Sequence, residues 1–101
     1  MELKSAFGKV LHWMRVKHGR TQEDFATVSS RTYISTLERG RYAPTIDKID
    51  TIASVIGVHP VTLMIGSYAL KENRSVADVL NEVAQDIERI ELATGISDLQ
   101  D

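Results

Sequence analysis

The fold is decided by residues 21–40, TQEDFATVSSRTYISTLERG. The segment opens with Thr21, whose hydroxyl suits an N-cap, and continues with acidic residues that favour the first turn of a helix. Phe25, Ala26 and Val28 would form the inner face of that helix. Two serines at positions 29 and 30 then interrupt the pattern with polar residues and offer a second N-cap. The residues that follow, up to Gly40, can form the second helix of the segment. The segment therefore predicts two short helices joined by a tight turn.

The chain on both sides of this segment also predicts helices, because its apolar residues recur every three or four positions and do not alternate. Residues 2–17 predict the first helix, and Gly19 is suited to end it. Thr45 would cap a fourth helix ending at Gly57, and Pro60 would begin a fifth that runs toward residue 70. The periodic apolar positions of the fourth helix are Ile46, Ile49, Ile52, Ala53 and Ile56.

A sixth helix is predicted from Ser75 to about residue 93, before Gly95. The predicted fold is all-α, a five-helix domain plus an additional C-terminal helix. We divide the chain into residues 1–70 and residues 71–101, with the polar run 71–74 as the joint.

Composition bounds the function. The chain has 101 residues, of which 43% are hydrophobic and 26% charged, which is typical of one globular domain. It contains no cysteine, which excludes disulfides, thiolate metal sites and cysteine nucleophiles. No apolar run approaches the ~18 residues that span a bilayer, and the N-terminus lacks the layout of a secretory signal. We expect a cytoplasmic protein with no membrane partner.

The net charge of −2 hides an uneven distribution. Residues 1–45 carry eight basic and four acidic side chains, a net charge of +4, whereas residues 46–101 carry four basic and ten acidic side chains, a net charge of −6. Such asymmetry suggests a basic binding surface joined to an acidic region with another role. The overall charge therefore does not argue against nucleic acid as a partner.

The third predicted helix has an outward face that suits DNA. Its side chains can donate to phosphates or to base edges in a major groove. They are Arg31, Thr32, Ser35, Thr36 and Arg39. Taken alone, the same pattern also suits an ordinary solvated helix face.

Four motifs in order decide between these alternatives. They are Gln22-Glu23-Asp24-Phe25-Ala26, Tyr33-Ile34-Ser35, Leu37-Glu38-Arg39-Gly40 and Pro44-Thr45. Together they resemble the signature of the xenobiotic-response-element family, the phage-repressor and Cro-like helix-turn-helix regulators, over about residues 3–68. The resemblance implies that the third helix enters the major groove of double-stranded DNA.

The resemblance also implies roles for single residues. Glu38 and Arg15 resemble an ion pair that ties the third helix to the first. The residues expected to contact DNA are Gln22, Ser30, Arg31, Thr32, Tyr33, Ser35, Thr36, Arg39 and Arg41. Arg20 stands where the family has an apolar residue, and we expect it to face phosphates as well. The turn region is also about two residues shorter than the family's, so the second helix ends early or the turn is tighter.

The last predicted helix carries an apolar seam, spaced 4, 3, 4 and 3, which is typical of a helix that packs on another helix. The seam consists of Val76, Leu80, Val83, Ile87 and Ile90. It either folds back onto its own domain or forms the interface of a homodimer. The fifth helix is a rival interface through Val61, Leu63, Met64 and Tyr68. We expect a homodimer because one recognition helix contacts only a few base pairs.

No other motif indicates chemistry. The three histidines lack metal-ligand spacing, and no glycine-rich phosphate loop or nucleophile motif is present. We therefore expect no catalytic site, no metal and no cofactor. The predicted function is a transcriptional regulator that binds a palindromic or pseudopalindromic operator. The alternative is an antitoxin-type or antagonist protein that binds a partner protein through its acidic C-terminal region as well as DNA. The possible protein partners are a polymerase, a toxin or an antagonist.

Overall fold

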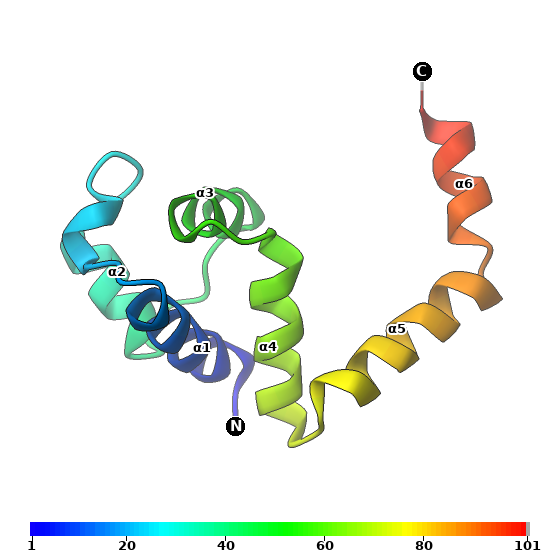
Figure 1. The fold of residues 1–101 in the computed structure, drawn as a ribbon, viewed down its shortest axis with the longest axis horizontal. Helices are drawn as coiled ribbons and strands as arrows, with labels where there is room; N and C mark the ends of the chain where they lie inside the picture. Colours follow the sequence, from blue (N-terminus) through cyan, green and yellow to red (C-terminus); the bar gives the residue numbers. More distant parts are fainter. Residues whose placement is uncertain (101) are drawn as a thin grey trace.

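The computed structural model describes residues 1–100, and every regular element within them is helical (Figure 1). The elements are α1 (Leu3–Lys17), η1 (Gln22–Phe25), α2 (Arg31–Glu38), α3 (Ile46–Ile56), α4 (Pro60–Glu72), α5 (Val76–Arg89) and α6 (Leu92–Leu99). The first five elements pack into one domain, and α5 and α6 leave it as an arm (Figure 1). The all-α prediction, with a five-helix domain, is confirmed.

The core of the domain draws apolar side chains from all five elements. Its buried members are Phe7, Leu11, Phe25, Ile34, Leu37, Ile52, Ala53, Ile56 and Leu63. Each fully buried Leu, Ile or Phe contributes roughly 1.5–3 kcal/mol of transfer free energy. Since α2 supplies two core residues in only eight, its orientation is set by burial rather than by its own helix propensity.

Side-chain caps fix where the helices begin. The hydroxyl oxygens of Ser30, Thr45 and Ser75 accept from backbone N–H groups three residues on. His59 caps α4 through Nδ1, which accepts from Val61 N at 3.0 Å. These local hydrogen bonds explain why the starts of α2, α3, α4 and α5 agree with the sequence prediction.

The predicted second helix is wrong beyond Phe25. Thr21 and Asp24 cap each other, with Thr21 N donating to Asp24 Oδ2 at 2.7 Å and Asp24 N to Thr21 Oγ1 at 3.3 Å. This closes a four-residue 3₁₀ turn, η1. Ser30 already starts α2, so the short connection leaves no room for a second helical turn, and Ala26 is exposed rather than on an inner face.

Two further predictions are wrong. Ile46 is 86% exposed, because it is the first residue of α3 and its side chain is not on the core side of the helix. The last helix does not run to residue 93, since Glu91 adopts a left-handed conformation (φ 55°) and a second helix, α6, follows it. Gly95 lies inside α6 and does not end a helix, because an exposed glycine lowers helix stability by only ~1 kcal/mol.

The arm projects away from the domain. The radius of gyration is 15.0 Å, against about 13 Å for a compact chain of this length. Only Val79 of α5 is buried, and the seam residues are 39–56% exposed, so the seam does not fold back onto its own domain. Arg74 fixes the bend, because its Nη1 contacts Glu72 Oε1 at 2.9 Å and Glu82 Oε1 at 2.6 Å.

No single helix within residues 1–100 has the length and hydropathy needed to cross a bilayer. Only α3 and α4 taken together reach that length and hydropathy, and they are bent by 105° relative to each other.

Candidate nucleic-acid interface

The helix α2 has one buried and one open side. Ile34 and Leu37 are fully buried, while Thr32 and Arg39 are exposed and Ser35 is half-buried. The core thus holds α2 so that its polar residues face away from the domain. A helix held in this way can enter a groove of DNA without unfolding anything.

Thr36 and Ser30 have structural roles within this helix. Thr36 Oγ1 lies 3.0 Å from Thr32 O and 2.8 Å from Tyr33 O, so its hydroxyl donates back into the helix. Ser30 Oγ accepts from Tyr33 N at 3.0 Å as the N-cap. We predicted that both residues contact DNA. Because each hydroxyl is already hydrogen-bonded to the backbone of α2, a contact with DNA would use the donor or the lone pair that remains.

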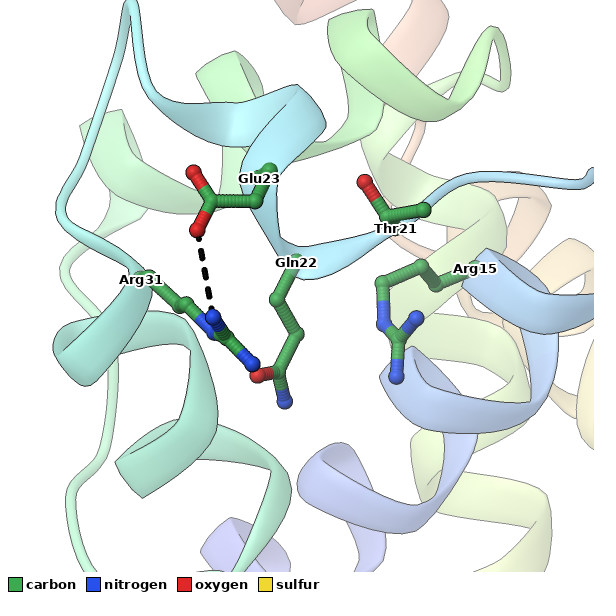
Figure 2. Close-up of a pocket in the computed structure, with 5 residues that line it drawn as sticks. All are labelled: Arg15, Thr21, Gln22, Glu23 and Arg31. Carbon is green, nitrogen blue, oxygen red and sulfur yellow. Dashed lines mark hydrogen bonds and ion pairs between the residues drawn. The ribbon is translucent and has the colours of Figure 1, made fainter.

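A hollow of about 310 Å³ lies between α1, η1 and the start of α2 (Figure 2). Figure 2 shows that Arg15, Gln22 and Arg31 extend toward it from these three elements. Arg31 Nη1 pairs with Glu23 Oε1 at 3.3 Å, and both side chains are about two-thirds exposed. Arg15 and Gln22 already donate to Glu38, so Arg31 is the donor in the hollow most available to a phosphate, with the carboxylate of Glu23 competing for it.

Glu38 binds three side chains behind this hollow. Arg15 Nε donates to Glu38 Oε2 at 2.6 Å and Arg15 Nη2 donates to Glu38 Oε1 at 3.0 Å, a bidentate pair. His12 Nδ1 lies 2.9 Å from Glu38 Oε1, and Gln22 Nε2 donates to the same oxygen at 3.2 Å. The structure thus brings together Arg15 and Glu38, which were expected to pair. It adds His12 and Gln22, whose contacts with Glu38 the sequence did not predict.

The Arg15–Glu38 pair is nearly closed to solvent, although His12 is not. The side chains of Arg15 and Glu38 are 10% and 6% exposed. Burial raises the pKa of Glu38, but hydrogen bonds from Arg15, His12 and Gln22 outweigh it and hold the pKa below its ordinary value. The hydrogen bond to Glu38 raises the pKa of Arg15. The pair is thus fully charged at neutral pH and ties α2 to α1.

Gln22 is placed differently from its predicted role. Its amide nitrogen is directed at Glu38 rather than outward, so a phosphate contact would come from the remaining amide N–H.

Three arginines around α2 carry free positive charge. Arg20, Arg39 and Arg41 are exposed, and none pairs with a carboxylate among residues 1–100. With Arg31, the first residue of α2, they lie before and after this helix in the sequence, and such a group of cations suits a polyanionic backbone. Within the same residues, no three His, Asp or Glu side chains are close enough to hold a metal ion.

Tyr33 is held by a residue that sequence reasoning missed. Its ring is half-buried against the core, and Lys48 Nζ lies 5.4 Å from the ring centroid. The same ammonium donates to Val28 O at 2.7 Å, so α3 restrains the loop between η1 and α2. No local signal marks Lys48, because it is one of several charged residues between the isoleucines of α3.

The two surfaces predicted as rival dimer interfaces lie next to each other. Val61 and Ile65 of α4 line one hollow with Val76 and Leu80 of the seam, and Val83 lines a second hollow beside α4. They form one apolar surface across α4 and α5. Leu63 is fully buried and cannot belong to it, because it faces the core of its own domain.

Comparison with known proteins places this geometry in context. Residues 11–63 match a family model described as helix-turn-helix. The chain is 35% identical over 66 residues to the uncharacterized HTH-type transcriptional regulator y4dJ of Sinorhizobium fredii, an alignment that covers 63% of this chain and 86% of that protein. It is 27% identical over 70 residues to the immunity repressor protein of Bacillus phage phi105, covering 59% of this chain and 48% of the repressor. The chain thus spans about half the length of that repressor.

Two solved chains of the clp gene regulator ClgR from Corynebacterium glutamicum are similar in structure, each at 25% identity. One has a TM-score of 0.64 and covers 68% of this chain and 92% of its own. The other has a TM-score of 0.65 and covers 89% of this chain and 90% of its own, which extends beyond the five-helix domain into the arm.

Proposed function

This chain belongs to the helix-turn-helix family of phage-repressor and Cro-like regulators, which bind DNA and are not enzymes, and we propose that it controls transcription from a palindromic or near-palindromic operator as a cytoplasmic homodimer. The observation that carries the proposal is the open, polar side of α2, a helix that exposed and unpaired arginines precede and follow in the sequence. The operator sequence, the dimer and the site residues are parts of this proposal.

We assign the contacts by exposure and geometry. Thr32 and Ser35, on the open side of α2, contact base edges in the major groove. Arg20, Arg39 and Arg41 contact phosphates, which position the protein without selecting a sequence. On binding DNA, Arg31 leaves its ion pair with Glu23 and contacts a base or a phosphate. The exposed ion pair is easily broken, because it stabilises the protein by at most ~1 kcal/mol.

A homodimer follows from the apolar surface across α4 and α5. Its seam residues are 39–56% exposed in a single chain, and such exposure along a whole stripe marks an interaction site. A twofold dimer places two copies of α2 about one DNA turn (~34 Å) apart, which matches a palindromic operator. Leu80→Asp should yield monomers in sedimentation, whereas Asn81→Asp, off the seam on the same turn, should leave the dimer intact.

The decisive experiment is selection of bound DNA from a random-sequence library, followed by sequencing. We expect an enriched pair of inverted half-sites with a fixed spacing. Failure to enrich any site would contradict the proposal.

Variants then test the contacts on the selected operator. Arg31→Ala and Ser35→Ala should each weaken specific binding by roughly 1–3 kcal/mol. Arg89→Ala is the matched control, because Arg89 lies on the arm and pairs with Asp86 at 3.2 Å, far along the chain from α2. Wild-type affinity of both α2 variants would show that α2 is not the recognition helix.

A second candidate function uses the arm. Every residue of α6 is exposed, and the arm carries most of the chain's surplus of acid, which suits a basic protein partner of the kind that an antitoxin-type or antagonist protein binds. This function competes with the homodimer for the same apolar surface. A library without any enriched operator, together with a monomeric chain, would favour it.

A further inference from the structure

The chain's only tryptophan lies in the open. Trp13 on α1 is 61% exposed, although burying a tryptophan is among the largest single gains available to an interface. It lines an apolar groove between α1 and α4 with Val10, Met14, Gly66 and Leu70, bordered by Lys9 and Val76. We call this set the Trp13 groove.

A glycine forms the floor of the groove. A Cβ on Gly66 would lie 3.1 Å from Val10 Cγ1 and 3.8 Å from Met14 Cε, so the absence of a side chain there lets α1 and α4 pack closely. The contact between the two helices closes the floor, and Trp13 lines the groove above it.

The helix α6 has an apolar stripe that is largely exposed in a single chain. Leu92, Ile96 and Leu99 are spaced four and three residues apart, so they lie on one side of the helix. They are 40%, 42% and 79% exposed. An eight-residue helix of this kind is not stable in water unless its apolar side is buried.

Charge favours a match between the two surfaces. Residues 1–74 carry eleven basic and seven acidic side chains, a net charge of +4, and residues 75–100 carry one basic and six acidic, a net charge of −5. Lys9 stands at the edge of the groove, and Glu91 and Asp98 flank the stripe on α6. Within one chain α6 projects away from the domain (Figure 1), so the fitting occupant is the α6 of another copy.

We propose that α6 of a second copy docks in the Trp13 groove, so that each arm crosses to its partner's domain. This rests on the homodimer of the proposed function and adds to it a second contact, distinct from the seam. The two are continuous, because Val76 borders the groove and also begins the seam. The crossing arms tie both recognition helices into one rigid unit.

Cross-linking identifies the occupant, since the chain has no natural cysteine. A Lys9→Cys chain is mixed with an Ala93→Cys chain and treated with a short bismaleimide, and we expect a covalent dimer. Asn81→Cys, which lies on α5 outside the seam, is the control and should give little product with Lys9→Cys. A chain carrying both Lys9→Cys and Ala93→Cys that cross-links only within itself, at any concentration, would overturn docking between copies.

Trp13 fluorescence measures the docking itself. In the dimer we expect emission at shorter wavelength and reduced acrylamide quenching. Both should be lost in Ile96→Asp and both retained in Thr94→Asp, which adds the same charge on the side of α6 opposite the stripe. Sedimentation on the same samples separates the two proposals. A wild-type dimer whose Trp13 is quenched as freely as in Ile96→Asp would overturn the docking alone, whereas a wild-type monomer would overturn the homodimer and the docking together.

Discussion

Replacing Glu38 by glutamine tests the network that holds α2 against α1. The substitution keeps the shape of the side chain but leaves Arg15, whose side chain is 10% exposed, without a counter-charge. Breaking a buried ion pair in this way costs about 3–5 kcal/mol. Arg15 keeps its hydrogen bond to Arg20 O at 2.9 Å, so we expect the lower end, about 3 kcal/mol. In a domain of this size that lowers Tm by roughly 12–24 °C.

The assay is thermal and urea unfolding at several pH values, with circular dichroism as the readout. The pKa of Glu38 is lowered in the folded state, so its contribution is fully present above the unfolded pKa of about 4.3 and is lost as pH falls through the lower folded value. Wild type should therefore lose stability below about pH 4.3. Glu38→Gln should lack this part of the pH dependence.

A double variant completes the test. Arg15→Met with Glu38→Gln removes the unpaired charge, so it should recover a large part of the stability lost in Glu38→Gln alone. A loss below 1 kcal/mol in Glu38→Gln, or a double variant no more stable than the single one, would refute the reasoning that desolvation of Arg15 sets the cost.

Three further outcomes are expected. Gly8→Ala should destabilise the domain by about 1–2 kcal/mol in urea unfolding, because a Cβ there would overlap Leu37 O and lie 2.8 Å from Glu38 O, and this overlap outweighs the ~1 kcal/mol gained in helix propensity. Gly95→Ala, where a Cβ meets open space, is the control and should stabilise its helix, α6. A Gly8→Ala variant more stable than wild type would contradict the close approach of α1 and α2. Arg41→Ala should weaken binding to all DNA sequences alike and reduce the slope of log K against log salt by about 1, measured by fluorescence anisotropy; a loss confined to the operator would assign Arg41 to a base instead. Glu23→Gln should tighten binding by up to ~1 kcal/mol, about fivefold, because it frees Arg31 and removes a carboxylate from the DNA side; weaker binding would mean that Glu23 orients Arg31 productively.

Local signals in the sequence were sufficient for four of the domain's five elements, α1, α2, α3 and α4. Caps such as Ser30 and Thr45 and the repeat of apolar residues act over three or four positions, so a single segment contains the whole cause of a helix start. The same short range explains the failure at Ala26. Whether η1 continued depended on how few residues separate it from Ser30, the N-cap of α2.

The pairing of Arg15 with Glu38 was expected only through resemblance to a family, because 23 residues separate them and no local pattern joins them. That His12 and Gln22 converge on the same carboxylate came from the packing of α1, η1 and α2 together.

The sequence by itself determined an all-α chain with a helix-turn-helix and a separate apolar seam, because periodicity, caps and composition are properties of neighbouring residues. Only the tertiary structure decided which apolar residues are buried in the core. Leu63 is buried while Val61, two residues away, stays exposed, and the seam on α5 and the stripe on α6 point into solvent. Burial depends on which surfaces meet across the whole chain, and in a single copy the arm meets the domain only where α5 leaves α4, at Val79.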